Sequence, residues 1–305
     1  MNHAPPVQAM QARVLIPFAI VTLIWGSTWL VIRDQLGVVP PSWSVCYRFL
    51  IAGLTMLCYA VVRGDSLKLD RAGVAFALGM ALSQFVLNFN FVYRAELYIT
   101  SGLVAVVFAL LVVPNAIFGR IFLGQKVSAR FVLGSAIAIA GLALLFIHEA
   151  RRDDAAAGST LIGIGTTLLA VLCASAANVM QASDVSRRYP MASMLAWAML
   201  GGSAINAIYA WSTAGPPVID LRWGYIAGLL YLGVLASAVA FTLYFGVIRV
   251  IGPAKAAYSS VLIPVIAMLL STLFEGYRWS LLAAVGCALA FAGLVIALRA
   301  RRPAR

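Results

Sequence analysis

The chain has 305 residues, of which 63% are hydrophobic and only 10% charged, and its mean hydropathy is +0.97. A soluble domain of this length cannot bury so much apolar surface, so lipid must solvate much of the chain. The net charge of +12 comes from basic residues scattered singly or in pairs between apolar runs, which argues against a nucleic-acid-binding face. The four cysteines each stand alone without CxxC or Cys/His spacing, so we expect no metal site and no redox role.

Ten segments are apolar and long enough to cross a membrane as a helix, which takes about 20 residues. They are 14–32, 43–62, 73–92, 99–118, 129–147, 160–182, 192–211, 224–243, 254–274 and 279–298. The first run is not followed by a small-residue cleavage site, and we expect a retained helix there rather than a signal peptide. The sequence therefore predicts an all-α integral membrane protein of ten transmembrane helices joined by short loops.

One stretch of the sequence occurs twice, half a chain apart. The first copy contains Gly102, Pro114, Gln125, Gly134 and Gly141, and the second contains Gly252, Pro264, Glu275, Gly286 and Gly293. The first three positions recur at an offset of 150 residues and the two glycines at 152. We interpret this pattern as a duplication into two five-helix repeats, residues 1–150 and 151–305, with a charged and flexible linker at the start of the second.

The orientation of the repeats follows from helix number and charge. Because each repeat holds an odd number of helices, the second must enter the membrane from the side opposite to the first. Fifteen Lys and Arg residues lie on one predicted side and six on the other, with Arg48 inside a helix. The basic excess marks the cytoplasm and predicts that both termini lie there. Inverted repeats of this kind place a substrate near the bilayer midplane, in a central cavity between the halves.

Polar residues within the predicted spans mark the protein interior, because lipid offers them no hydrogen bonds. Gln84 and Asn88 are four residues apart and share a helix face, and Asn178 and Gln181 are three apart. The set expected to line a substrate pocket is Trp25, Ser27, Trp29, Gln84, Asn88, Asn178, Gln181, Tyr258 and Ser260. Its aromatic faces and neutral amides suit a small molecule with an apolar or aromatic group. The alternative is that these side chains only join helices by hydrogen bonds.

Two prolines and two stripes of small residues predict moving and supporting helices. Pro114 and Pro264 each remove a backbone donor inside a span. Because the two prolines lie at matching points of inverted halves, they indicate hinges for alternating access. The alternative is that each proline only makes a static kink in its helix. The stripes are formed by Gly134, Ala138, Gly141, Gly286, Ala290 and Gly293. Stripes of this kind allow close helix packing, so we expect the fifth and tenth helices to support the bundle or to contact each other.

Charge within the spans is nearly absent. Arg48 is expected to reach the outer interface or to anchor a loop. Lys255 starts the ninth predicted helix and is expected to snorkel to the cytoplasmic surface, where it would also meet a carboxylate-bearing substrate. No Asp or Glu lies in the middle of a span, which argues against proton-driven export of cations. We expect facilitated movement down a gradient, or coupling through a route that the sequence does not reveal.

The chain shows none of the patterns that carry common catalytic chemistry. It has no phosphate loop of the form GxxxxGK[ST], no HExxH motif and no convincing catalytic carboxylate pair or Ser/His/Asp set. We therefore expect neither an enzyme nor an ATP-driven pump, and no cofactor.

Several motifs carry a resemblance to a known family. They are Trp25-Gly26-Ser27 in the first helix, Pro41 and Arg48 in the second, and the repeated G-x11-P-x10-[EQ] followed by G-x6-G. With ten helices in two halves, the chain resembles the drug/metabolite transporter (DMT) superfamily, within it the EamA-type exporters, and most closely the YddG-type aromatic amino acid exporters. Gln125, where the family usually has Glu, and Trp197, the counterpart of Arg48, depart from the pattern.

The resemblance implies a ten-helix basket in the bacterial inner membrane, with a central cavity lined by helices 1, 3, 4, 6, 8 and 9. It also implies export of amino acids such as phenylalanine, tryptophan or threonine-like metabolites. The leading hypothesis is an exporter of aromatic or neutral amino acids that works by alternating access. We expect its partners to be the small-molecule substrate and membrane lipid, and we expect the chain to be a monomer. Alternatives are efflux of drugs, nucleobases or other metabolites, and, from another class, a membrane-embedded enzyme or a receptor.

Overall fold

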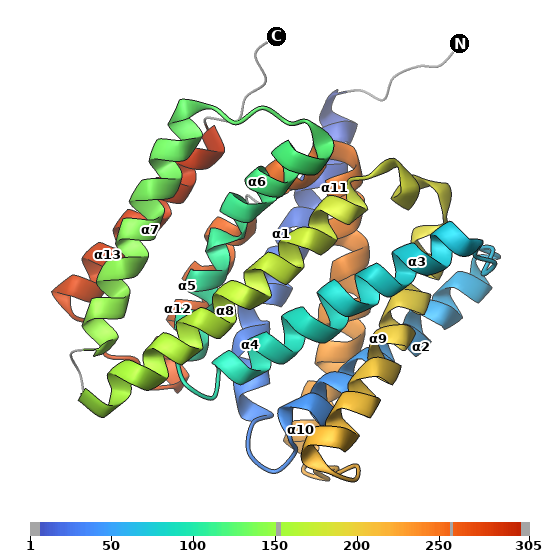
Figure 1. The fold of residues 1–305 in the computed structure, drawn as a ribbon, viewed down its shortest axis with the longest axis horizontal. Coiled ribbons are helices and arrows are strands. Elements are labelled where there is room, and N and C mark those ends of the chain that lie inside the picture. Colours follow the sequence, from blue (N-terminus) through green and yellow to red (C-terminus); the bar gives the residue numbers. More distant parts are fainter. Residues whose placement is uncertain (1–6, 151–153, 257–258, 300–305) are drawn as a thin grey trace.

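The computed structural model describes residues 7–150, 154–256 and 259–299, and within these ranges the chain forms helices and no strands (Figure 1). The helices of the first half are α1 (Val7–Asp34), α2 (Pro41–Val62), α3 (Arg71–Met80), α4 (Phe89–Ala95), α5 (Ser101–Phe108), α6 (Val112–Leu123) and α7 (Ala129–Ala150). Those of the second half are α8 (Asp154–Gln181), α9 (Met191–Ala214), α10 (Trp223–Leu230), α11 (Ala240–Ala256), α12 (Ser259–Phe274) and α13 (Leu281–Arg299). The predicted all-helical class is confirmed.

Among the described residues, seven helical stretches are long and apolar enough to cross a membrane. They are Val14–Asp34, Pro41–Val62, Arg71–Ala95, Ser101–Leu123, Gly158–Gln181, Met191–Ala214 and Trp223–Val250. Three shorter apolar helices, Ala129–Leu145, Leu262–Phe274 and Leu281–Ala297, accompany them. This composition agrees with a membrane protein, while the number of ten spans and the inverted orientation of the halves stay predictions.

Two of the long spans contain a π-helical segment that the sequence pattern did not indicate. The segment η1 (Ala81–Asn88) joins α3 to α4, and η4 (Tyr231–Val239) joins α10 to α11. Their first residues are 231 − 81 = 150 positions apart, the same offset as the sequence repeat. Wide turns of this type widen the hydrogen-bonded ring and occur mostly at functional sites. The matched positions therefore indicate a functional role for these two segments, and η1 carries Gln84 and Asn88.

The boundary expected between the eighth and ninth helices is wrong. Helix α11 extends to Ala256, so Lys255 lies in its last turn and does not start the next helix. Pro253 lies inside α11, because the fixed φ of proline is compatible with a helix and only one hydrogen bond is lost. The side chain of Lys255 lies outside the described residues.

Helices α7 and α13 lie side by side at one edge of the molecule (Figure 1). Their small-residue stripes face each other: a Cβ atom on Gly141 would lie 2.4 Å from the backbone nitrogen of Ala290, and one on Gly293 would lie 2.3 Å from that of Ala138. A Cβ atom on Gly134 would lie 2.3 Å from the backbone nitrogen of Ala297, and one on Gly286 would lie 2.8 Å from the carbonyl oxygen of Gly141. Only glycine permits this approach, because any side chain would enter the neighbouring backbone.

The remaining helices enclose the middle of the molecule. Helix α2 packs along α9, and α1 packs against α12 and α5. Amide side chains join some of them, since Asn90 of α4 donates to the Asn206 oxygen of α9 at 2.6 Å, and Asn206 donates to the Phe85 carbonyl of η1 at 2.9 Å. In a membrane such hydrogen bonds replace water as the partner of buried polar groups. This frame holds η1 and α4 against α9.

Candidate substrate-binding cavity

A cavity of about 90 Å³ lies in the middle of the bundle, between helices from both halves. Side chains of α1, α2, η1, α4, α5, α8, α11 and α12 line it, together with the 3₁₀ turn η2 (Ala109–Leu111) between α5 and α6. Ligand pockets commonly measure about 300–1,000 Å³, so this conformation is constricted. A substrate of amino-acid size requires helices to move apart before it can enter.

Aromatic rings form one wall of the cavity. The Trp25 ring packs edge-on against Phe241 and Tyr244, with ring centroids 5.2 and 4.8 Å apart. Its Nε1 donates a hydrogen bond of 3.0 Å to the carbonyl of Ala236 in η4. Trp29, one turn later in α1, also lines the cavity and packs at 5.5 Å against Phe108. Such rings offer a large apolar surface and a negative face to a ligand.

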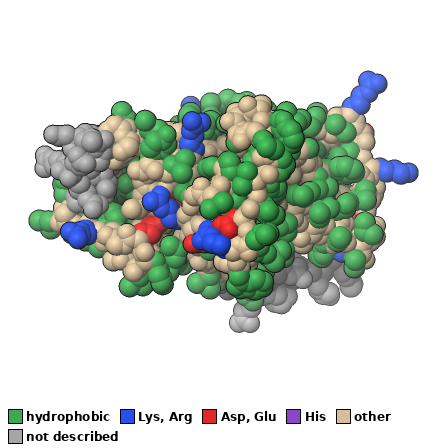
Figure 2. Space-filling model, turned by 90° about the horizontal axis from the view of Figure 1, so that it is seen from below, with side chains coloured by type: hydrophobic (Ala, Val, Ile, Leu, Met, Phe, Trp, Pro, Cys, Tyr) green, Lys and Arg blue, Asp and Glu red, His purple; other side chains and the backbone are tan. Residues whose placement is uncertain are grey.

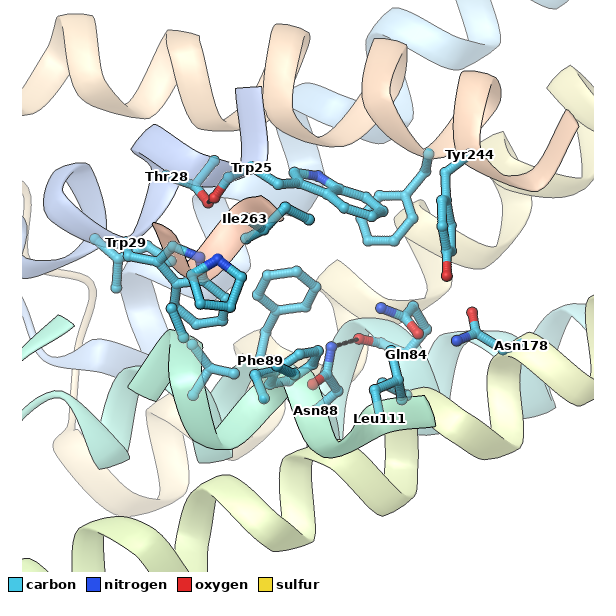
Figure 3. A pocket seen from close by; sticks show the side chains of 18 of the residues that line it. Trp25, Thr28, Trp29, Gln84, Asn88, Phe89, Leu111, Asn178, Tyr244 and Ile263 are labelled. Carbon is cyan, nitrogen blue, oxygen red and sulfur yellow. Dashed lines mark hydrogen bonds between the residues drawn. The ribbon is translucent and has the colours of Figure 1, made fainter. Parts of the chain in front are cut away.

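Neutral amides form the opposite wall and lie across the cavity from Trp25 (Figure 3). Gln84 and Asn88 are both buried and project from η1. The side-chain Nδ2 of Asn88 donates a hydrogen bond of 3.4 Å to the backbone carbonyl of Gln84. The side-chain oxygens Gln84 Oε1 and Asn88 Oδ1 accept no hydrogen bond from the described residues. Asn178 of α8 lines the same wall and donates to the Asn115 side chain of α6 at 3.5 Å. Two residues that line the cavity therefore each carry a buried acceptor oxygen without a partner among the described residues.

Arg48 also lines the cavity, and the expectation that it reaches the interface or anchors a loop is wrong. Its side chain is only 1% exposed, and its Nε donates to Ser237 Oγ of η4 at 2.9 Å. The guanidinium carbon lies 4.3 Å from the centroid of the Phe89 ring, a cation–π contact. Helices α4 and η4 cover this position, and the sequence could not show which helices would enclose it.

The Arg48 guanidinium is incompletely paired. Its Nη1 has no hydrogen-bond partner among the described residues, and no described acidic side chain forms an ion pair with it. A buried charge without a counter-ion is unfavourable unless polar contacts or a ligand compensate it. The residue pattern predicted an uncharged pocket of aromatic rings and neutral amides. The structure instead places one positively charged side chain, Arg48, at the cavity.

Ser27 and Gln181, two other residues predicted for the pocket, do not line the cavity. Ser27 does not line the cavity: its hydroxyl bonds to the Ile24 carbonyl at 2.9 Å and to the Tyr231 hydroxyl at 2.6 Å, which joins α1 to η4. Gln181 is buried at the end of α8 but is not among the lining residues. Tyr258, together with the side chains of Ser260 and Lys255, lies outside the described residues.

The two prolines occupy different surroundings. Pro264 of α12 lines the cavity, whereas Pro114 is buried in α6, just after η2. The 3₁₀ turn before Pro114 shows how the chain adapts its hydrogen bonds to the missing donor. Hinge motion at either position stays a prediction.

Comparison with known proteins identifies the chain. Residues 13–147 and residues 161–299 each match the model of the EamA-like transporter family. The chain belongs to the EamA-like transporter family. The predicted membership of the drug/metabolite transporter superfamily is thereby confirmed at the level of the EamA family.

Three relatives of this EamA-family protein come from bacteria. PagO of Salmonella typhimurium is 26% identical over 86% of this chain and 85% of its own. The uncharacterized inner membrane transporter YedA of Escherichia coli is 28% identical over 82% of this chain and 79% of its own. A probable terminal-alkyne amino-acid exporter of Streptantibioticus cattleyicolor is 25% identical over 89% of both chains. A solved crystal structure superposes with a TM-score of 0.70 at 21% identity, over 96% of this chain and 99% of that chain, and shares the fold.

These findings set the general function. The protein is a multi-pass protein of the bacterial inner membrane and an EamA-family transporter. Family and relatives indicate a transporter of small molecules rather than an enzyme.

Proposed function

We propose that this protein exports zwitterionic amino acids, above all those with aromatic or other apolar side chains, across the inner membrane. The observation that carries the proposal is the incompletely paired Arg48 in a cavity of aromatic rings and amides. An amino acid has the complementary groups, namely a carboxylate, an ammonium and a side chain. The aromatic specificity implied by the resemblance to YddG-type exporters is part of this proposal.

Each group of the substrate finds a partner of suitable chemistry. The carboxylate would accept a charge-assisted hydrogen bond from Arg48 Nη1, which is stronger than a bond between neutral groups. The ammonium would donate to Gln84 Oε1 and Asn88 Oδ1, whose acceptor capacity is free. The side chain would lie against Trp25 and Phe241, where ring contacts add to apolar burial. A relative described as a probable amino-acid exporter supports the same substrate class.

Transport in this proposal proceeds by alternating access between two inverted halves. The two separate matches to the family model and the π segments 150 residues apart support halves at 1–150 and 151–305. The constricted cavity is the form between openings to either side, and Pro114 and Pro264 act as the hinges. The basic excess orients both termini to the cytoplasm. The chain works as a monomer in lipid, without ATP.

Counterflow in reconstituted liposomes tests the proposal. Vesicles preloaded with unlabelled L-phenylalanine should accumulate labelled L-phenylalanine only when they contain the protein. The cavity variants Trp25→Ala, Gln84→Ala and Asn178→Ala should lower this flux about tenfold, the equivalent of about 1.4 kcal/mol. Trp223→Ala is the matched control, because Trp223 is 80% exposed and lies outside the cavity.

The outcome distinguishes the rival functions. An absence of protein-dependent flux, or equal flux in the cavity variants and the control, refutes amino-acid transport through this cavity. A panel of unlabelled competitors separates amino acids from drugs and nucleobases. If nucleobases or cationic drugs compete and amino acids do not, the substrate class is wrong while transport stands.

A further inference from the structure

A second buried polar cluster lies at one end of the molecule, where α4 ends and α5 begins. Glu96 caps the last turn of α4, is 0% exposed and has no hydrogen-bond partner on either carboxylate oxygen among the described residues. It follows directly after the span Arg71–Ala95. Val92, one helical turn earlier, lines the central cavity. Glu96 thus lies beyond one end of that cavity, and the transport proposal does not use it.

Glu275 from the second half joins this cluster. It follows α12, and its Oε2 accepts hydrogen bonds from the Ser101 backbone at 3.2 Å, the Ser101 hydroxyl at 2.9 Å and the Ser271 hydroxyl at 2.5 Å. Its Oε1 is buried without a partner among the described residues. Because Ser101 is the first residue of α5, Glu275 connects the end of α12 to the start of α5. These contacts hold the two halves together at this end.

The groups that face Glu96 come from four elements. They are Glu275 after α12, Arg33 of α1, Arg48 of α2 and Tyr93 of α4. Arg33 Nη1 donates to the backbone carbonyl of Glu96 rather than to its carboxylate. Burial, and then the neighbouring Glu275, raise the pKa of Glu96 well above its ordinary value, although Arg33 and Arg48 act in the opposite direction. Burial and the neighbouring Glu275 together therefore favour the protonated carboxyl of Glu96.

Acidic side chains at the surface of this end differ from the buried Glu96 in having basic neighbours. Acidic side chains visible in Figure 2, which looks onto this end, lie beside Lys or Arg side chains. In the loop before α10, Asp220 Oδ2 forms an ion pair with Arg222 Nε at 2.6 Å. Glu96 has no such pairing of its carboxylate. A metal cation at Glu96 would meet the positive charges of Arg33 and Arg48, whereas a proton forms a neutral acid with a single oxygen.

We propose that Glu96 is a proton-binding site whose occupancy controls closure of this end of the transporter. When the end is closed, the Glu96 carboxylate has taken one proton from water and lies as a neutral acid beside the charged Glu275. When the end opens, water reaches Glu96 and the proton leaves to it, which restores the carboxylate. Two adjacent negative charges then repel each other and oppose closure of α12 onto α5. This role deepens the proposed transport function and supplies a route for coupling to a pH gradient.

The test uses infrared spectroscopy of the purified full chain in lipid nanodiscs, without substrate. The wild type should show the carbonyl stretch of a buried protonated carboxyl that disappears as the pH is raised. Glu96→Gln should remove this band. Glu275→Gln should retain it and move its titration midpoint to lower pH, because the neighbouring charge is gone. Asp34→Asn removes an exposed acid at the end of α1 and should leave the band unchanged.

The outcomes separate this site from the transport proposal. If no titrating band is lost in Glu96→Gln, or if sodium rather than pH moves the band, the proton site is refuted. Should Glu96→Gln fail to fold, the Glu275→Gln shift decides, and an unchanged midpoint refutes the site. Because no substrate is present, failure here leaves amino-acid export standing. A band that behaves as expected without any amino-acid flux refutes only the export proposal.

Discussion

The contact between α7 and α13 permits a quantitative prediction. In Gly141→Ala the added Cβ atom would lie 2.4 Å from the Ala290 nitrogen and 2.5 Å from the Gly286 oxygen, where ordinary contacts begin near 3.4 Å. Both obstacles are backbone atoms, so no side chain can rotate away and the helices must separate by about 1 Å. Overpacking of this kind costs about 1–3 kcal/mol. The better helix propensity of alanine offsets about 0.5–1 kcal/mol of this cost, so we expect a net destabilisation of about 0–2.5 kcal/mol.

The matched control is Gly165→Ala in α8, where the added Cβ meets no atom within 4 Å. Here only helix propensity acts, and we expect a gain of about 0.5–1 kcal/mol. The assay is unfolding by denaturing detergent in mixed micelles, followed by far-ultraviolet circular dichroism. If Gly141→Ala is as stable as Gly165→Ala, the close approach of the two helices is refuted.

Three further predictions concern single side chains. Because folding raises the pKa of Glu96, the protonated carboxyl contributes stability at acidic pH. This contribution is lost as the pH rises above about 4.5, the ordinary pKa, and through the pKa of Glu96 in the folded state. The melting temperature of the wild type should therefore fall over this pH range, whereas that of Glu96→Gln should stay level. Trp25→Phe keeps a ring but removes the donor to the Ala236 carbonyl, and should cost about 1 kcal/mol in detergent unfolding, with a smaller loss contradicting the bond. Asn206→Leu leaves the Asn90 amide and the Phe85 carbonyl without this partner, and should cost about 1 kcal/mol; unchanged stability would show that water replaces it.

The sequence was sufficient for the residues that are unusual within a span. Trp25, Trp29, Gln84, Asn88 and Asn178 stand out in apolar helices, and the structure places all five around one cavity. Their spacing could be read because a helix face repeats every three to four residues. Whether they bind substrate stays a prediction that flux measurements must test.

The residues that the sequence did not reveal depend on which helices meet. Arg48 near a helix end resembles a snorkelling arginine until α4 and η4 are seen to cover it. Phe241 and Tyr244 are ordinary residues in an apolar run, where lipid-facing and cavity-facing rings have the same sequence signature. Glu96 lies in the short stretch between the predicted spans 73–92 and 99–118, and only the fold shows that this position is buried. The matched π segments were also hidden, since no residue type specifies them.

The most direct test of the central claim is the affinity of the purified protein for L-phenylalanine and for its two analogues with one charge each. Phenethylamine lacks the carboxylate and hydrocinnamate lacks the ammonium, and each can be titrated by isothermal calorimetry in nanodiscs. A charge-assisted bond of about 1.5–3 kcal/mol predicts that the wild type binds L-phenylalanine about tenfold to a hundredfold more tightly than phenethylamine. Arg48→Gln should abolish this preference, while Arg222→Gln, outside the cavity, should retain it. Equal affinity of the wild type for L-phenylalanine and phenethylamine would contradict the account. An unchanged preference of Arg48→Gln for L-phenylalanine over phenethylamine would contradict it as well.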